Sequence, residues 1–304
     1  MDIGKIQEDL KRLVPSGTIK SHESLKDHVF TKIGGRADIL AAPSTYEEIQ
    51  AIVTYAAENG ITLTILGNGS NVIIRDGGIR GIVLQTPGLS GIHSEGNLVI
   101  AQCGAQIIDT SRFALERKLT GLEFACGIPG TVGGALYMNA GAYGGEVADV
   151  LQSALAIDKT GAMVKLEGDD LKWGYRKSVF SSGDYLILEA RFALKEGNYE
   201  EIKAGMDKLT EMRESKQPLE YPSCGSVFKR PPGRFAGQLI QESGLQGTRI
   251  GGAEVSKKHA GFIINADNAT ASDYIGLIQH VRETVKGHFG VELETEVEII
   301  GEEL

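Results

Sequence analysis

Apolar and polar residues alternate along the chain with two different periods. Short β-branched runs bounded by glycine or asparagine are typical of strands, and longer amphipathic stretches are typical of helices. We predict strands over residues 37–43, 61–66, 81–85, 92–94, 98–101, 261–266 and 291–300. We predict helices over residues 44–59, 107–118, 199–216, 235–243 and 271–288, and short strands joined by turns at 159–161 and 182–184 within residues 151–195. Helices and strands are thus mixed along the whole chain, which predicts an α+β fold.

Local signals refine two of these elements. Ser44 and Glu47 have the spacing of a capping box at the start of the first predicted helix, and Gly60 is placed to end it. At the other end of the chain the predicted strand 291–300 alternates strictly. Its four glutamates are expected on one solvated face, and they are Glu292, Glu294, Glu296 and Glu298.

Length and composition limit the architecture and the class of protein. At about 150 residues per domain, 304 residues predict two or three domains, which we place at residues 1–88, 89–205 and 206–304. A net charge of −9 argues against a nucleic-acid binder that relies on a general basic field. The charged start MDIGKIQEDLKRLV is not a signal peptide, and no run of about 18 uncharged apolar residues could span a membrane. We therefore expect a soluble cytoplasmic protein without membrane contact.

Three cysteines occur without a C-x-x-C pair, so the spacing predicts neither a zinc site nor a disulfide framework. They are Cys103, Cys126 and Cys224, and we interpret them as reduced thiols of a cytoplasmic protein.

Glycine is the compositional outlier, with 40 residues in 304. Two glycine-rich loops stand out, residues 67–71 directly after a predicted strand and residues 127–141. Such a loop can turn several backbone N–H groups toward a diphosphate, although the first loop alone is equally consistent with an ordinary turn. It lacks the Lys-Ser/Thr of a Walker loop, and Val72 occupies the third glycine position of the dinucleotide fingerprint. Two such loops together predict one large nucleotide cofactor.

Several motifs, in order along residues 31–301, resemble a known family. They are Gly34-Gly35-Arg36-Ala37, Leu66-Gly67-Asn68-Gly69-Ser70-Asn71, Gly127-Ile128-Pro129-Gly130-Thr131-Val132-Gly133-Gly134-Ala135, Met138-Asn139-Ala140-Gly141-Ala142-Tyr143-Gly144, Tyr175-Arg176-Lys177-Ser178, Cys224-Gly225-Ser226-Val227-Phe228-Lys229, Lys258-His259-Ala260-Gly261-Phe262 and Leu293-Glu294-Thr295-Glu296-Val297. The first three resemble the flavin-binding fold of the vanillyl-alcohol-oxidase (PCMH) type. All of them together resemble the UDP-N-acetylenolpyruvoylglucosamine reductase family, flavoenzymes of peptidoglycan precursor synthesis.

The resemblance implies non-covalent FAD, NADPH as co-substrate and UDP-N-acetylglucosamine enolpyruvate as substrate. It implies two α/β flavin-binding subdomains, 1–88 and 89–205, and an α+β substrate domain, 206–304, whose last strand returns to the active site. The cofactor-binding residues that it implies are Gly67, Asn68, Gly69, Ser70, Asn71, Gly127, Ile128, Pro129, Gly130, Thr131, Gly133, Gly134, Ala135, Asn139 and Gly141. NADPH would reduce the flavin and leave before the sugar nucleotide enters the same cleft.

Three residues match the catalytic positions of the family. Ser226 would be the proton donor, Arg176 would pair with the substrate carboxylate, and Glu296 would hold that carboxylate or assist proton delivery. Without the resemblance, Ser226 would be interpreted as a turn serine, Arg176 as a surface ion pair and Glu296 as part of the solvated glutamate face. The resemblance alone selects them.

Five further residues are candidates for substrate contact, and they are Tyr175, Arg213, Lys216, Lys229 and His259. The cations suit an anionic diphosphate, although Arg213 and Lys216 are equally consistent with ordinary helix-surface charge. Lys229 is also expected to make the surroundings of Ser226 more positive. For His259 a structural role or a ligand contact is as consistent with the sequence as catalysis, and we interpret Cys224 as a packed small residue.

The chain departs from the longer form of the family. Only a short hairpin is predicted between Phe180 and Tyr199, so the extra loop that carries a substrate-covering tyrosine has no counterpart. Arg230 also replaces an asparagine of the longer form, so that substrate contact is not carried over. The chain thus resembles the shorter type II form.

Two alternatives remain open at this stage. One is another flavin oxidoreductase of the same fold, for example an oxidase, against which Arg176, Ser226 and Glu296 argue together. The other is a non-catalytic protein that binds nucleotides or UDP-sugars.

Overall fold

The computed structural model describes residues 2–304, which form two compact units. The first unit comprises the chain up to Ser21, Ile39–Asn68 and Gly81–Arg213; the second comprises His22–Asp38, Gly69–Arg80 and Glu214–Leu304. Both units are therefore assembled from separate stretches of sequence. The finer division into three domains stays a prediction. No helix within residues 2–304 is both long enough and apolar enough to cross a membrane.

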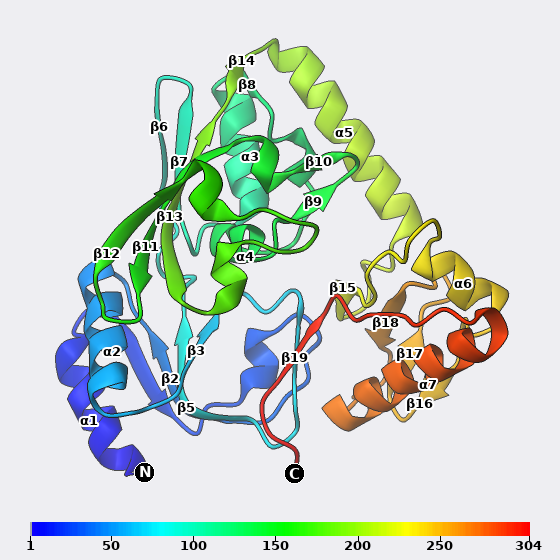
Figure 1. Cartoon of the computed structure of the whole chain (residues 1–304), viewed down its shortest axis with the longest axis horizontal. Coiled ribbons are helices and arrows are strands. Elements are labelled where there is room, and N and C mark those ends of the chain that lie inside the picture. Colours follow the sequence, from blue (N-terminus) through cyan, green and yellow to red (C-terminus); the bar gives the residue numbers. More distant parts are fainter. Residues whose placement is uncertain (1) are drawn as a thin grey trace. The chain divides into compact units, whose positions relative to one another are not determined.

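The N-terminal sheet has the strand order β1-β2-β5-β3 and carries two helices (Figure 1). Its elements are β1 (Thr18–Ser21), β2 (Ala37–Ala42), β5 (Ile79–Gln85), β3 (Leu63–Leu66), α1 (Ile3–Leu13) and α2 (Tyr46–Glu58). β3 and β5 run parallel, and the chain between them passes through the first glycine-rich loop and β4 (Val72–Ile74).

The start of α2 differs from the predicted capping box. Thr45 caps the helix, and its hydroxyl accepts from the Glu48 backbone N–H at 3.2 Å. The buried Glu48 carboxylate accepts from the backbone N–H groups of Ser44 and Ser16 at 2.7 and 2.6 Å. The Ser44–Glu47 box was therefore wrong by one residue, since Glu48 is the buried glutamate and its carboxylate binds the backbone at Ser44 and Ser16.

A five-stranded antiparallel sheet forms the second layer of the first unit, in the order β12-β11-β13-β7-β6 (Figure 1). Its strands are β6 (Ile92–Glu95), β7 (Leu98–Gln102), β11 (Leu151–Asp158), β12 (Met163–Glu167) and β13 (Tyr185–Ala193). The remaining elements are α3 (Ile107–Glu116), β8 (Leu119–Thr120), η2 (Glu123–Ala125), α4 (Val132–Tyr137), β9 (Gly141–Ala142), β10 (Gly145–Glu146), η3 (Val147–Asp149), η4 (Gly168–Leu171), η5 (Val179–Ser182) and β14 (Lys195–Glu196). The hairpin predicted between Phe180 and Tyr199 is instead mainly β13, a strand that pairs with β7 and β11.

The second unit is built on the sheet β15-β18-β17-β16 with two helices packed on it (Figure 1). Its elements are η1 (Leu25–His28), β4 (Val72–Ile74), β15 (Ser223–Ser226), α6 (Ala236–Glu242), β16 (Arg249–Ile250), β17 (Ala253–Val255), β18 (Phe262–Asn265), α7 (Ala271–Phe289) and β19 (Glu298–Ile300). The helix α5 (Tyr199–Lys216) carries the chain from the first unit into the second, with the bounds that the sequence predicted.

The last predicted strand, 291–300, was too long. Only β19 at its end is a strand, and it pairs in parallel with β4. The preceding residues run extended beside the chain after β15, with one isolated bridge between Phe228 and Thr295. Leu293 and Val297 are buried there, so the alternation reflected which side chains point inward rather than a regular sheet ladder.

Candidate functional site

The two glycine-rich loops meet within the first unit. A Cβ atom on Gly67 would lie 2.6 Å from the Thr131 hydroxyl oxygen, so glycine is required at 67 for this approach. The Asn68 side-chain amide donates to Gln106 Oε1 at 3.0 Å, and Gln106 forms a backbone bridge with Thr131. The structure thus brings together two loops that are more than sixty residues apart in sequence.

The first loop leaves a series of backbone donors without protein acceptors. Within residues 2–304, the N–H groups of Gly67, Asn68, Gly69 and Ser70 donate to no protein atom. Gly69 is buried and has a φ of +67°, so only a residue without Cβ fits easily there. A buried N–H group without an acceptor costs free energy unless a bound group supplies one.

The second loop leaves fewer backbone N–H groups without a protein acceptor than its glycine content suggested. Several of its N–H groups donate to acceptors within the protein, namely those of Ile128, Val132, Gly133, Gly134 and Ala135. In the described chain, the N–H groups of Gly127, Gly130 and Thr131 have no protein acceptor, and Gly130 and Thr131 are buried. Gly127, Gly130 and Thr131 therefore each offer an N–H group to an anion, and the Thr131 hydroxyl lies beside Gly67.

Several glycines of these loops are explained by contacts within the protein. A Cβ on Gly133 would meet Cys103, one on Gly127 would meet the Arg213 side chain, and one on Gly141 would meet Gly145 and Glu146. The absence of side chains at these positions therefore allows tight packing of the chain on itself.

Asn139 has a structural role. Its side chain is fully buried, its amide donates to the Gly174 carbonyl at 3.2 Å, and its Oδ1 accepts from the Ala148 N–H at 3.0 Å. Both ends of the amide are thus bound to backbone, and the cofactor contact of Asn139 stays a prediction. It fixes the loop that carries Arg176 against the loop that follows α4.

Arg176 lies at the tip of a tight turn in the first unit. Gly174 and Lys177 exchange two backbone hydrogen bonds, of 2.9 and 3.1 Å, so Tyr175 and Arg176 are the two central residues. Arg176 has a φ of +54°, where glycine or asparagine is usual, and its Nη2 donates to the Gly141 carbonyl at 3.2 Å. Its guanidinium carbon lies 5.1 Å from the centre of the exposed Tyr175 ring. Such strain in a non-glycine residue points to a functional position.

Arg213 packs beside the second glycine loop. A Cβ on Gly127 would approach Arg213 Cδ to 2.7 Å, and the preceding turn of α5 contacts Cys126 through the Met206 carbonyl and the Thr210 hydroxyl. Burial lowers the pKa of the Arg213 guanidinium, while the Tyr143 phenol and the Cys126 thiol act in the opposite direction. Arg213 is thus a partly buried cation of the first unit, not the simple helix-surface charge of the alternative interpretation.

Ser226 is presented by a bulge in the second unit. β15 pairs with β18 through Ser223–Ile264 and Ser226–Phe262, and the register shifts between these two pairs. Gly225, inside the bulge, has a φ of +76°, and no atom lies within 4 Å of where its Cβ would be. The Ser226 side chain is exposed at the end of the strand. Bulges of this kind direct side chains next to functional sites.

Backbone bonds place Glu296 beside the same bulge. Its N–H donates to the Val227 carbonyl at 2.8 Å, and its own carbonyl accepts from the Asn71 side-chain amide at 3.1 Å. Glu296 is half-buried, whereas the other three glutamates of this stretch are exposed. The prediction of one uniform solvated face was therefore wrong at one position. Burial separates Glu296 from its neighbours, which the alternating sequence could not do.

Lys229 and Lys216 both belong to the second unit; Lys229 is half-buried, as Glu296 is, and Lys216 is exposed. Lys229 Nζ lies 3.4 Å from Glu294 Oε2, and its backbone N–H donates to the Glu294 carbonyl. The expected positive influence on Ser226 is therefore partly compensated by a carboxylate. Lys216 is an exposed residue at the end of α5.

His259 lies in the segment just before β18, the strand that pairs with β15. Its Nδ1 accepts from the Gly261 N–H at 3.2 Å, and its ring packs edge-on against Phe262 at 4.9 Å between centroids. Burial lowers the pKa of His259, so the neutral imidazole is favoured. With Nδ1 accepting, the hydrogen of the neutral ring is on Nε2. His259 is thus tied to the backbone opposite Ser226.

The cysteines are consistent with packed thiols. All three are free and buried, and burial raises the pKa of Cys103 and of Cys224 to about 12. At neutral pH these two residues are protonated and poorly nucleophilic.

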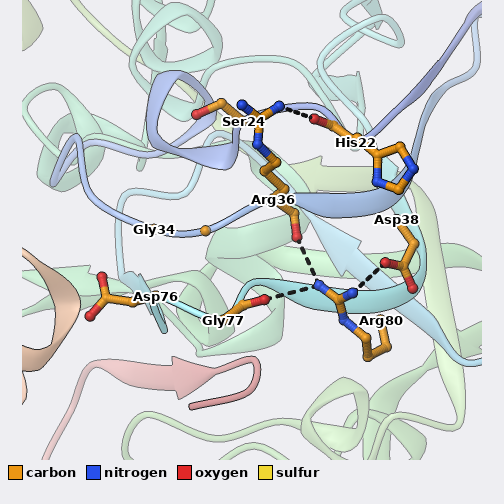
Figure 2. Close-up of a pocket in the computed structure, with 9 residues that line it drawn as sticks. His22, Ser24, Gly34, Arg36, Asp38, Asp76, Gly77 and Arg80 are labelled. Carbon is orange, nitrogen blue, oxygen red and sulfur yellow. Dashed lines mark hydrogen bonds and ion pairs between the residues drawn. The ribbon is translucent and has the colours of Figure 1, made fainter. Parts of the chain in front are cut away.

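A separate pocket in the second unit explains the Gly34-Gly35-Arg36 motif (Figure 2). Arg80 pairs with the buried Asp38 at 2.6 Å and donates to the Gly77 carbonyl at 2.9 Å, while Arg36 donates to the His22 carbonyl at 2.7 Å. The cavity has a volume of about 390 Å³, and two aspartates balance its two arginines. None of the site residues predicted above lines it. The motif therefore serves the local packing of the chain.

Comparisons with known proteins agree with this arrangement. A family model described as an FAD binding domain matches residues 37–167, and the model of the C-terminal domain of UDP-N-acetylenolpyruvoylglucosamine reductase matches residues 217–300. UDP-N-acetylenolpyruvoylglucosamine reductase 2 of Bacillus cereus (strain ATCC 10987 / NRS 248) is 60% identical over 303 residues, which cover 100% of this chain and 99% of the relative. The chain belongs to this reductase family.

Further relatives support the assignment over the whole length. The reductase of Shouchella clausii (strain KSM-K16) is 59% identical over 300 residues, covering 99% of this chain and 96% of that protein. The crystal structure of the reductase from Thermus caldophilus aligns with a TM-score of 0.81 at 33% identity, covering 94% of this chain and 100% of the other. Family membership confirms the predicted α+β flavin-binding fold. The chain is an oxidoreductase with FAD as its cofactor.

The residues of the first unit fit this cofactor. The diphosphate of FAD needs convergent hydrogen-bond donors, and the buried N–H groups of Gly130 and of Thr131, whose hydroxyl lies beside Gly67, need acceptors. The diphosphate oxygens can accept hydrogen bonds from these N–H groups. Gly67, Asn68, Gly130 and Thr131 are the residues of this unit that we expect to hold the diphosphate.

Proposed function

We propose that this chain reduces UDP-N-acetylglucosamine enolpyruvate to UDP-N-acetylmuramate with NADPH, in peptidoglycan precursor synthesis. The observation that carries the proposal is the full-length identity to reductases of this name, joined to the presence of Arg176, Ser226 and Glu296 in strained, bulged or half-buried positions. We also propose a cytoplasmic location, because the proposed substrate and reductant are cytoplasmic nucleotides.

The chemistry assigns different tasks to the protein and to the cofactor. Bound FAD supplies the hydride, which it receives from NADPH, for the terminal vinyl carbon of the enol ether. Negative charge then develops on the neighbouring carbon and spreads into the carboxylate. The protein must orient this carboxylate, stabilise the charge and deliver a proton to the carbon.

Arg176 stabilises the developing charge in this proposal. Its guanidinium is already fixed on one side by the Gly141 carbonyl and on one face by the Tyr175 ring. An arginine held this way loses little further freedom when it binds a carboxylate through its remaining N–H groups.

Ser226 delivers the proton. Its hydroxyl is exposed at the end of β15, and the bulge at Gly225 fixes its direction. Glu296, whose backbone is bonded to Val227, assists by orienting the carboxylate end of the substrate or by returning a proton to the serine. Tyr175 and Lys229 are proposed substrate contacts, and Arg213 and Lys216 are proposed diphosphate contacts.

The decisive experiment separates the two half-reactions. The purified protein should be yellow, and anaerobic NADPH should bleach the flavin absorbance. Adding the enolpyruvyl sugar nucleotide should then restore the absorbance within one turnover in a stopped-flow instrument. A colourless protein that takes up no FAD, or a bleached protein that this substrate does not reoxidise, would overturn the proposal.

A further inference from the structure

The last segment of the chain changes its backbone partner at Glu296. Shortly after this residue the segment forms β19, which pairs in parallel with β4 along the whole of both strands. Directly before it, Thr295 forms a bridge with Phe228, two residues after Ser226. Glu296 is thus the point at which the segment passes from the neighbourhood of the serine bulge to that of β4.

The main chain of Glu296 is held on both sides of this change. Its N–H donates to the Val227 carbonyl at 2.8 Å, and its carbonyl accepts from the Asn71 side-chain amide at 3.1 Å. The Asn71 carbonyl in turn accepts from the Glu298 N–H at 3.1 Å, where the ladder with β4 begins. Asn71 therefore binds two successive peptide groups of the segment, the first through its side chain and the second through its backbone.

The side-chain bond has a physical reason. The N–H of Glu296 is given to Val227, so the regular ladder with β4 does not extend to Glu296. A half-buried carbonyl that has left a ladder needs another donor, and the half-buried Asn71 amide supplies one. Because this bond is made to the main chain, its loss would displace the Glu296 carboxylate without removing it.

Asn71 has a fixed base from which to do this. It ends the first glycine-rich loop, and the end of that loop lies in the second unit together with Glu296. The loop packs closely on the segment before it, because the Phe30 N–H donates to the Gly69 carbonyl at 3.2 Å and a Cβ on Gly69 would meet Val29 at 2.5 Å. These contacts support the loop independently of Glu296.

We propose that Asn71 is a positioning residue, which holds the main chain of Glu296 so that the carboxylate stays directed at the substrate. The inference rests on the proposed function, in which Glu296 takes part in the oxidative half-reaction. It gives the Asn71 side chain a task besides the cofactor contact that the family resemblance implies.

The first test compares Asn71→Ala with the wild type. FAD is titrated into each apoprotein first, so that rates are compared at full loading. Anaerobic NADPH should bleach both flavins at the same rate, whereas reoxidation by the enolpyruvyl sugar nucleotide should be about 10- to 100-fold slower in the variant, the cost of misplacing a reacting group by about 1 Å. Unchanged reoxidation would overturn the inference. Equal slowing of both half-reactions would also overturn it and would assign Asn71 to the flavin alone.

The second test asks whether Asn71 acts through Glu296. Glu296→Ala should slow reoxidation at least as much as Asn71→Ala does, and adding Asn71→Ala to it should slow reoxidation no further, because the carboxylate to be positioned is absent. Effects of the two substitutions that multiply to within about twofold would show independent roles and overturn the inference.

A matched control separates positioning from a general loss of stability. Asn59→Ala removes the same kind of bond, from a side-chain amide to the Tyr55 carbonyl at 2.8 Å, at the end of α2 in the first unit. Its melting temperature should fall, but both half-reactions should keep the wild-type rates. A wild type that NADPH bleaches but the enolpyruvyl sugar nucleotide does not reoxidise would instead overturn the proposed function.

Discussion

Arg176 and Ser226 are both presented by kinked backbone, but the kink is carried by different residues. At the turn 174–177 the functional residue itself has the left-handed conformation, with a φ of +54°. At the bulge in β15 the preceding Gly225 has it, with a φ of +76°, and Ser226 pairs normally with Phe262. A non-glycine residue in this conformation costs about 1–2 kcal/mol, whereas glycine adopts it readily.

This difference shows two ways to direct a side chain out of regular structure. The serine side chain is short, so the backbone must set its direction. The bulge at Gly225 does this without strain, because glycine adopts a positive φ readily. The arginine is long, and its turn is closed by Asn139, whose amide donates to Gly174, and by its own bond to Gly141. The second arrangement tolerates strain because surrounding contacts determine the conformation.

The largest expected effect comes from removing the Ser226 hydroxyl. In Ser226→Ala, NADPH should still bleach the flavin at the wild-type rate, while turnover of the enolpyruvyl substrate should fall by about 10²–10⁴-fold, the contribution of a positioned general acid. Stopped-flow measurement of both half-reactions checks this. Turnover within about threefold of the wild type would remove Ser226 from its proposed role.

Arg176→Gln should have the second-largest effect. Loss of one preorganised donor to the developing charge is expected to slow reoxidation by about 10²–10³-fold, with the reductive half-reaction much less affected. Arg176→Lys is the matched control, because it keeps the charge but not the planar donor geometry, and it should recover only part of the rate. Full activity of the lysine variant would show that charge alone is required.

Much of the fold could be predicted from the sequence wherever apolar residues follow a single period, that of a helix or that of a strand. The helix α5 was predicted with its final bounds, and the hairpin β6–β7 follows from Gly96-Asn97 between two apolar runs. The capping box failed because two neighbouring hydroxyl residues, Ser44 and Thr45, both suit a helix start. Tertiary bonds to the Glu48 carboxylate decided between them.

The candidate site was harder to predict from the sequence pattern than the fold was. Alternation could not distinguish Glu296 from three other glutamates, because the half-buried position arises from a backbone bond to a distant strand end. Composition identified two glycine loops but not which N–H groups stay available, since that depends on internal bonds.

The contrast between the two kinks also predicts different stability effects of two matched substitutions. Gly225→Ala should destabilise the protein by about 1–2 kcal/mol through the left-handed φ alone, because no atom lies near the added Cβ. Arg176→Gly relieves that strain but adds flexibility to the unfolded chain, so its stability should stay within about 1 kcal/mol of the wild type. Urea unfolding of both variants measures the difference. Equal destabilisation by the two changes would contradict the contrast.

The smallest expected effect concerns the support of the serine bulge by His259. Burial lowers its folded-state pKa below the ordinary value of 6.5, so the unfolded chain takes up a proton first as the pH falls. This residue's contribution to stability is therefore complete above pH 6.5 and is lost as the pH falls from there through the folded pKa. In His259→Asn, whose amide oxygen can still accept from the Gly261 N–H, the decrease in melting temperature from about pH 7 to about pH 5 should be smaller than in the wild type. Because the ring is partly exposed, the difference should be small, and scanning calorimetry at matched ionic strength is the suitable measurement. The same decrease in both proteins would show that the histidine protonates equally in the folded and unfolded states, and would contradict this prediction.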